Sequence, residues 1–270
     1  MSLVSLRKEW SRALSDRHLG GDVDIPASPA DFATQLGITP DPWQVEVLQS
    51  DHPQKILLCA RRAGKTTVAA VLAIHKALTE PGSEVLILAP TEDQAKIAYS
   101  QAARLYRKAG APHGALSDRR TGLELRNGST IEARTALERS TRGRGADLLI
   151  LDEASRIHEE DYLGILPLLA ASGGEQMLLS TPNGKRGFFY EIWHDEADDG
   201  HRTRVVASDV PHRYPKGLEV FRRRMPEEYF LQEFYCEWLD TEGGLFSYED
   251  IEAALELGED VEALEIGDEW

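Results

Sequence analysis

Short apolar runs alternate with longer amphipathic stretches along most of the chain. The runs have the length and composition of buried strands, and they occupy residues 55–60, 84–90, 146–154, 175–182 and 202–208. The stretches 66–78 and 92–110 show the apolar spacing of helices. Strands that alternate with helices predict an α/β fold, with a mainly parallel sheet and helices on both faces. Ligands of such sheets bind beyond the carboxyl ends of the strands, so the polar residues that follow these runs are the candidates for chemistry.

The same pattern divides the chain into three expected segments. Residues 1–40 are predicted to form an N-terminal helical extension or lid. Residues 41–247 are predicted to form the α/β core with a closing C-terminal segment, including a hairpin over 123–134 around Asn127-Gly128. Residues 248–270 are expected to be an acidic tail or linker. The candidate chemistry therefore lies in the central segment.

The composition is that of a globular protein with an acidic charge balance. Hydrophobic residues make up 41% of the 270, charged residues 28%, and the formal net charge is −16. Any nucleic-acid surface must therefore be a local basic patch. No apolar run approaches the ~18 residues of a membrane span, and the charged N-terminus does not resemble a signal peptide. The two cysteines exclude a disulfide framework and a cysteine-rich metal site, which favours a reducing cytoplasm.

The first candidate motif runs from Cys59 to Thr67 and reads Cys-Ala-Arg-Arg-Ala-Gly-Lys-Thr-Thr. It follows an expected strand and opens an expected helix, which is the arrangement of a phosphate-binding loop. In such a loop Lys65 reaches the β- and γ-phosphates of a nucleotide, and the Thr66 hydroxyl binds Mg²⁺. Cys59 stands where the common pattern has its first glycine. The alternative is an accidental Gly-Lys-Thr at a helix start.

The second motif is the apolar run that ends in Asp152 and Glu153. Asp152 at the strand tip is suited to hold Mg²⁺, and Glu153 can orient and deprotonate an attacking water. A strand that simply ends in solvated acids is the alternative. The phosphate loop upstream favours the catalytic interpretation.

Three weaker signals surround these motifs. Arg142 and Arg144, flanked by glycines, could neutralise charge on the nucleotide of a neighbouring subunit, or contact a phosphate backbone. The amide of Gln44 could read adenine, or Gln44 could simply start a helix. Thr181, within Ser180-Thr-Pro-Asn-Gly184, could sense hydrolysis, or the turn could be an ordinary strand cap. Candidate DNA-contacting residues are the arginines at 119, 120, 126, 134 and 222–224.

Taken in order, the motifs resemble those of the large terminase subunit, the DNA-packaging ATPase of tailed viruses. The matching stretches are P-W-Q-x-x-x-L, A-R-R-A-G-K-T-T, L-A-P-T-x-x-Q-A, R-G-R-G-A-D-L-L-I-L-D-E-A, L-L-S-T-P-N-G and the segment 230–238. The resemblance covers residues from about 40 to about 247. It implies a P-loop NTPase fold of the RecA/ASCE type and Mg²⁺-dependent ATP hydrolysis coupled to translocation of double-stranded DNA.

The resemblance also implies roles for single residues. Glu153, Lys65 and Arg142 match the catalytic residues, with Arg142 offered to the next subunit of a ring. Thr66 and Asp152 match the Mg²⁺ ligands. Residues matched to ATP binding are Gln44, Arg61, Arg62, Ala63, Gly64, Lys65, Thr66, Thr67 and Thr181.

The implied setting is the cytoplasm of an infected host cell. The implied partners are further copies of the chain in a ring, a small terminase subunit and a portal, with no membrane. No nuclease activity is expected, because only about two dozen residues follow Phe246 and they lack strand alternation. A superfamily 2 helicase or translocase fragment and a non-catalytic, nucleotide-stabilised assembly module are the alternatives.

Overall fold

The computed structural model describes residues 24–137 and 145–240. One eight-stranded sheet forms its centre, in the order β3-β4-β5-β2-β6-β7-β1-β8. The strands are β1 (Gln54–Cys59), β2 (Glu84–Ala89), β3 (Ala115–Arg119), β4 (Gly122–Leu125), β5 (Thr130–Thr135), β6 (Leu148–Asp152), β7 (Glu175–Ser180) and β8 (His201–Val205). From β5 to β8 every neighbouring pair is parallel, whereas β3–β4 and β4–β5 are antiparallel. The predicted mainly parallel sheet is confirmed.

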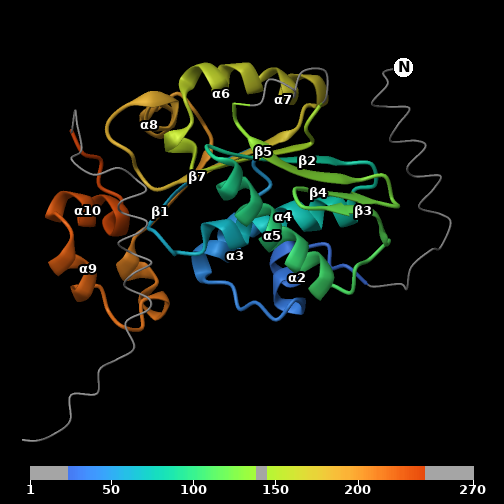
Figure 1. The fold of residues 1–270 in the computed structure, drawn as a ribbon, viewed down its shortest axis with the longest axis horizontal. Coiled ribbons are helices and arrows are strands. Elements are labelled where there is room, and N and C mark those ends of the chain that lie inside the picture. Colours follow the sequence, from blue (N-terminus) through green and yellow to red (C-terminus); the bar gives the residue numbers. More distant parts are fainter. Residues whose placement is uncertain (1–23, 138–144, 241–270) are drawn as a thin grey trace, which may run out of the picture.

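Helices cover both faces of the sheet, as predicted (Figure 1). On one face lie α2 (Pro29–Gln35), α3 (Pro42–Gln49), α4 (Lys65–Thr79) and α5 (Glu92–Lys108). On the other lie α6 (Glu159–Ile165), α7 (Pro167–Ser172) and α8 (Gly187–His194). The last described helices, α9 (Glu219–Arg224) and α10 (Glu227–Tyr235), lie beside one end of the sheet. Short 3₁₀ turns are η2 (Ala154–Arg156), η3 (Ala207–Asp209) and η4 (Pro211–Arg213).

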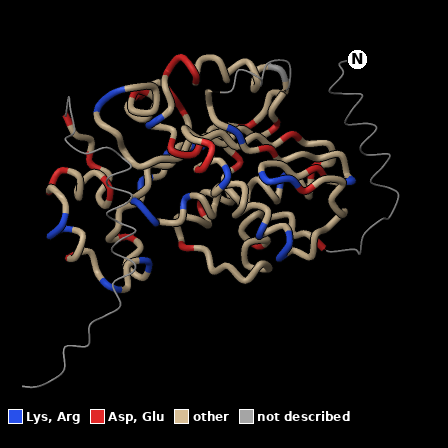
Figure 2. The backbone as a smooth tube through the Cα atoms, viewed as in Figure 1, with Lys and Arg blue, Asp and Glu red and all other residues tan. Residues whose placement is uncertain are grey.

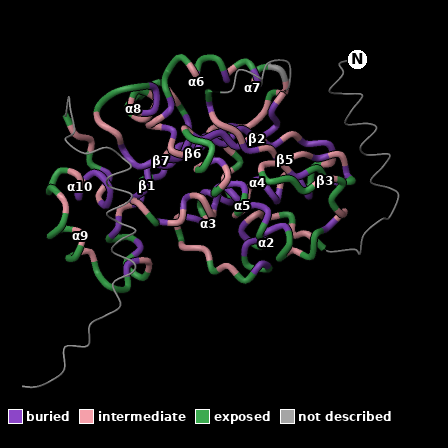
Figure 3. The backbone as a smooth tube through the Cα atoms, in the orientation of Figure 1, coloured by how far each residue is buried: buried purple, intermediate pink, exposed green. Residues whose placement is uncertain are grey.

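The buried positions follow from the sequence pattern. The central strands are buried along nearly their whole length, as expected for strands covered on both faces (Figure 3). Helix α5 begins where the Thr91 hydroxyl accepts a hydrogen bond from the Gln94 amide at 3.3 Å, and acidic residues occupy its first turn. No described helix is both long and apolar enough to cross a lipid bilayer.

One strand, β3, was not predicted from the sequence. Strand β3 pairs with β4 at the edge of the sheet, yet four of its five residues are exposed and Leu116 is among them. An edge strand without a buried face carries no apolar alternation, so nothing in the sequence marks it. The hairpin expected around Asn127-Gly128 does form, as β4 and β5, with Leu123 opposite Ile131.

Candidate nucleotide-binding site

The two main motifs lie at the same end of the sheet, beyond the carboxyl ends of β1 and β6. The loop 60–64 leaves β1, and its first amide donates to the Val205 carbonyl oxygen at 2.7 Å. Arg62 and Gly64 both have positive φ, 62° and 100°, so the loop turns sharply before α4 begins at Lys65. In phosphate-binding loops such a turn leaves the first amides of the following helix available to phosphate oxygens.

The structure brings the phosphate loop and the paired acids into contact. The Lys65 ammonium lies 2.9 Å from Glu153 Oε1, and the Thr66 hydroxyl donates to Asp152 Oδ2 at 3.5 Å. Lys65 and Asp152 are each only 7% exposed. Two adjacent pairs of candidate residues, more than 80 positions apart in the sequence, therefore form one largely buried polar cluster.

Charge and burial set the protonation of this cluster. Burial, with the neighbouring Glu153 charge, raises the pKa of Asp152 to about 6. Burial also acts to raise the pKa of Glu153, but Lys65, Arg156 and Arg61 outweigh it and hold that pKa below its usual value. Glu153 is therefore ionised at neutral pH, which is the form that can accept a proton from water.

The backbone and a hydroxyl hold Glu153 in place. Glu153 has a left-handed backbone conformation, with φ of 52°, and its amide donates to Asp152 Oδ1 at 3.0 Å. The Ser180 hydroxyl donates to Glu153 Oε2 at 3.3 Å and lies 2.7 Å from the Ser155 hydroxyl. Thr181, the candidate that the sequence offers in this turn, is buried, but the hydroxyl that contacts Glu153 belongs to Ser180.

A further buried carboxylate lies behind the loop. Glu233 of α10 is 1% exposed, and its two oxygens lie 3.8 Å from Arg61 Nη1 and 3.6 Å from Arg156 Nη2. Burial raises the pKa of Glu233, although both arginines act against this. Glu233 lies in the segment 230–238 that resembles the family, but no signal in the sequence gives this residue a role. Only the packing of α10 against the loop shows it.

Gln44 also lies at the phosphate loop. Its amide nitrogen donates to the Gly64 carbonyl oxygen at 3.2 Å, and its amide oxygen accepts from the Asp41 backbone at 2.9 Å. Gln44 is 1% exposed. The structure thus places Gln44 beside the loop, and adenine recognition by it stays a prediction.

The residues present fit a nucleotide-bound Mg²⁺. Thr66 and Asp152 offer two oxygen ligands, and Mg²⁺ in nucleotide sites takes only one or two protein ligands, with phosphate and water oxygens completing its shell. Within the described ranges, no group of three or more His, Cys, Asp or Glu side chains could hold a metal ion by itself.

The other candidates lie elsewhere or outside the described residues. Arg142 and Arg144 fall within 138–144, which the structure does not describe. Arg134 pairs with Glu132 at 2.7 Å, and Arg222 pairs with Glu227 at 2.9 Å. Lys and Arg are interspersed with acidic residues over the described chain (Figure 2).

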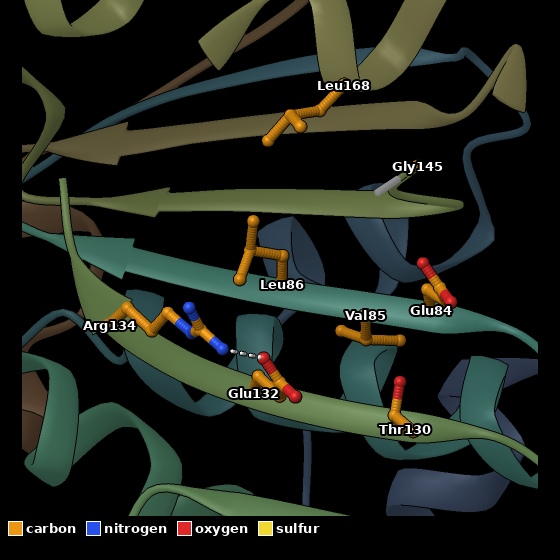
Figure 4. A pocket seen from close by; sticks show the side chains of 8 residues that line it. All are labelled: Glu84, Val85, Leu86, Thr130, Glu132, Arg134, Gly145 and Leu168. Carbon is orange, nitrogen blue, oxygen red and sulfur yellow. Dashed lines mark hydrogen bonds and ion pairs between the residues drawn. The ribbon is translucent and has the colours of Figure 1, made fainter. Parts of the chain in front are cut away.

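A hollow on the sheet face between β2 and β5 is too small for a nucleotide. Its cavity volume is about 30 Å³, and Leu86, Thr130 and the Glu132–Arg134 pair line it (Figure 4). This space has room for only one or two water molecules. The candidate chemistry is therefore at the strand ends and not on this face.

A parallel sheet with a phosphate loop after β1 and two acids at the tip of β6 defines a P-loop NTPase. Comparison with known proteins then gives the family. The family model for the N-terminal part of the terminase large subunit, T4likevirus-type, matches residues 56–253, and the chain belongs to this family. This assignment decides against the helicase alternative.

Individual relatives agree with the family. The terminase large subunit of Escherichia phage T5 is 30% identical over 223 residues, covering 78% of this chain and 51% of the phage T5 protein. That of Thermus virus P23-45 is 28% identical, covering 81% and 53%. The chain therefore spans about half the length of these relatives. Among solved structures, the large terminase ATPase domain of Thermus phage P74-26 matches with a TM-score of 0.68 and 25% identity, over 79% of this chain and all of that domain.

Proposed function

We propose that this chain is the ATP-hydrolysing part of a viral DNA-packaging motor, which couples Mg²⁺-dependent ATP hydrolysis to movement of double-stranded DNA into a procapsid. The observation that carries the proposal is the contact of the phosphate loop with the paired acids, through Lys65–Glu153 at 2.9 Å and Thr66–Asp152 at 3.5 Å. The family assignment supports it. A solved protein of the same fold, the large terminase of a thermophilic bacteriophage, forms complexes with ADP and with ATP-γ-S.

In this proposal each residue of the cluster has a separate task. Lys65 binds the β- and γ-phosphates, and Thr66 and Asp152 hold the Mg²⁺, which neutralises phosphate charge when bound. The Lys65–Glu153 ion pair must loosen when a triphosphate takes over the ammonium. Glu153 is then free to orient a water in line with the γ-phosphorus and to accept its proton.

The remaining assignments come from the resemblance. Arg61 contacts the γ-phosphate, and the turn at Thr181 passes the loss of that phosphate on to the DNA-binding surface. Arg142 acts on the nucleotide of the neighbouring subunit in a ring. Double-stranded DNA, a small terminase subunit and a portal are the proposed partners, in the cytoplasm of an infected cell. These 270 residues are proposed to leave DNA uncut, which plasmid digestion in Mg²⁺ or Mn²⁺ checks.

Substitution of Glu153 tests the proposal. Glu153→Gln keeps the shape of the side chain but cannot accept a proton, so we expect turnover to fall by about 10²- to 10⁴-fold while ATP still binds. Phosphate release and ATP binding are measured on the same preparation. Glu159→Gln, an exposed acid at the start of α6, is the matched control and should retain full turnover. Full turnover by Glu153→Gln would contradict the role of Glu153.

A further inference from the structure

The connection between β8 and α9 touches both the phosphate loop and the start of α3. Three consecutive residues make these contacts. His212 Nε2 lies 3.0 Å from Asp41 Oδ1, ahead of α3. The Tyr214 hydroxyl donates to the Arg61 carbonyl oxygen within the loop. Between them, Arg213 reaches Asp41, Gln44 and Gly64.

Arg213 is held mainly by Asp41. Its Nε and Nη2 donate to Asp41 Oδ2 at 2.9 and 2.6 Å, and Nη2 also donates to Gln44 Oε1 at 3.3 Å. The guanidinium packs tightly on Gly64, because a Cβ added there would lie 2.9 Å from Arg213 Cζ. Arg213 thus has two strong bonds to the carboxylate and one longer bond to the amide of Gln44.

The longer bond uses the part of Gln44 that distinguishes nucleobases. An amide oxygen has two lone pairs, and both are taken, one by the Asp41 backbone amide at 2.9 Å and one by Arg213. The amide nitrogen gives one hydrogen to the Gly64 carbonyl oxygen and has a second to offer. In this arrangement Gln44 can only donate to a base.

Donation alone does not separate adenine from guanine. Both purines present N7 as an acceptor, whereas the neighbouring position is an amino donor in adenine and a carbonyl acceptor in guanine. To recognise adenine, Gln44 must accept from its amino group, and that requires a lone pair now occupied by Arg213.

We propose that Arg213 is a positioning residue that sets base selectivity, because Gln44 reads adenine through both halves of its amide only after Arg213 has released the amide oxygen. Release leaves the two bonds to Asp41 intact, so the guanidinium keeps its charged partner. The proposal rests on the proposed function, and on the prediction from the sequence that a nucleotide at the phosphate loop places its base beside Gln44. It adds a determinant of ATP over GTP that lies 169 residues away from Gln44 in sequence.

Nucleotide binding by Arg213→Met tests the proposal. Methionine keeps an apolar stem against Gly64 and removes the donors, while Asp41 and Gly64 still hold the Gln44 amide. Dissociation constants for ATP and GTP are measured by displacement of a nucleotide that is fluorescently labelled on its ribose. We expect the variant to bind ATP about tenfold more tightly than wild type does, because the charged hydrogen bond from Arg213 to Gln44 no longer has to break. The affinity for GTP should stay unchanged.

Two further variants keep the experiment decisive. Arg107→Met removes an arginine at the end of α5 whose carboxylate partner is Asp118 of β3 at 2.9 Å, outside the candidate nucleotide site, and it should leave the ATP-to-GTP ratio unchanged. Arg213→Ala repeats the test if the methionine variant shows a loss of helical circular dichroism. Equal weakening of both nucleotides would overturn the proposal, since Arg213 would then bind nucleotide directly. An unchanged ratio would also overturn it, whereas failure of the wild-type chain to bind ATP would instead overturn the proposed function.

Discussion

At the scale of single residues, Gly64 carries two demands at once. Its φ of 100° is a conformation that residues with a Cβ rarely adopt, and it is also packed between side chains. A Cβ there would lie 2.8 Å from Gln44 Nε2 and 2.9 Å from Arg213 Cζ. Only glycine therefore fits this position, both for the backbone conformation of the loop and for the close approach of the neighbouring side chains.

Gly64→Ala should therefore lower the free energy of unfolding more than alanine does at a glycine that has a positive φ but no close neighbours. Gly187 has a φ of 77° with nothing within 4 Å of an added Cβ, which makes it the matched control. We expect Gly187→Ala to lower the free energy of unfolding by about 1 kcal/mol, and Gly64→Ala by about 2–3 kcal/mol with loss of nucleotide binding. Urea denaturation and nucleotide titration measure both. Equal losses would show that packing at Gly64 is unimportant.

Residues whose chemistry is local could be found in the sequence, and residues defined by distant contacts could not. Lys65 and Thr66 follow a strand and open a helix, and Asp152 and Glu153 end an apolar run, so their roles follow from neighbouring positions. Glu233 has its partners far along the chain, and Arg213 likewise contacts Asp41 across 172 positions. No periodicity or spacing signals such a contact.

At the scale of elements, ion pairs connect strands and a helix at the end of the sheet that lies away from the phosphate loop. Glu175 at the start of β7 accepts from Lys55 of β1 at 3.3 Å and from Lys76 of α4 at 2.8 Å. Lys55 has only 5% of its side chain exposed, so one carboxylate serves two largely buried cations. Both lysines and Glu175 line a cavity of about 710 Å³. Glu175 thereby ties two strands and one helix together.

Removal of the Glu175 charge should destabilise the fold in a pH-dependent way. Burial acts to raise its pKa, but Lys76 and Lys55 outweigh burial and hold it below the ordinary value of 4.5. A lowered pKa stabilises the folded state above the unfolded value, and that contribution is lost as pH falls through the lowered value. We expect Glu175→Gln to lose about 1–2 kcal/mol at pH 7, discounted because Glu175 is partly exposed, and the difference from wild type to disappear as the pH falls through the lowered pKa of Glu175.

Urea denaturation at a series of pH values from 7 down to about 3 measures the difference between the variant and wild type. Glu80→Gln is the control, because Glu80 pairs with Lys76 at 2.9 Å with 55% of its side chain exposed. That variant should lose less than about 0.5 kcal/mol. A loss by Glu175→Gln that stays constant down to about pH 3 would mean that its cause is packing and not charge.

The elements themselves were predictable where burial shaped the sequence. All five parallel strands that were expected are present, with ends shifted by a few residues; 202–208, for example, is observed at His201–Val205. Strand β3 was missed, because its exposed residues leave no alternation to read. Residues 1–23 of the expected N-terminal extension and the acidic tail lie outside the described residues.

At the scale of the whole molecule, the proposed function requires more than one chain. If Arg142 acts on the neighbour's nucleotide, a subunit with Arg142→Ala and a subunit with Glu153→Gln are each inactive alone but complement each other when mixed. In an equal mixture about a quarter of the sites would combine an intact Glu153 with an intact Arg142 from the next subunit.

We therefore expect the mixture to recover about a quarter of the wild-type ATP turnover at protein concentrations where wild-type turnover per chain has stopped rising. Phosphate release over a concentration series measures this. Each variant alone, at the same total protein concentration, is the control. An inactive mixture at those concentrations would place Arg142 within its own subunit or remove it from the reaction.

The strand order also fixes when the phosphate loop can take its shape during synthesis. Strand β1 lies between β7 and β8, so both of its neighbours are made more than a hundred residues after it. When only the first half of the chain has emerged from the ribosome, β1 has neither of its neighbouring strands to pair with. Because such distant pairings close large loops, they slow folding. The amino-terminal half must wait for the rest of the sheet before it can form a nucleotide pocket.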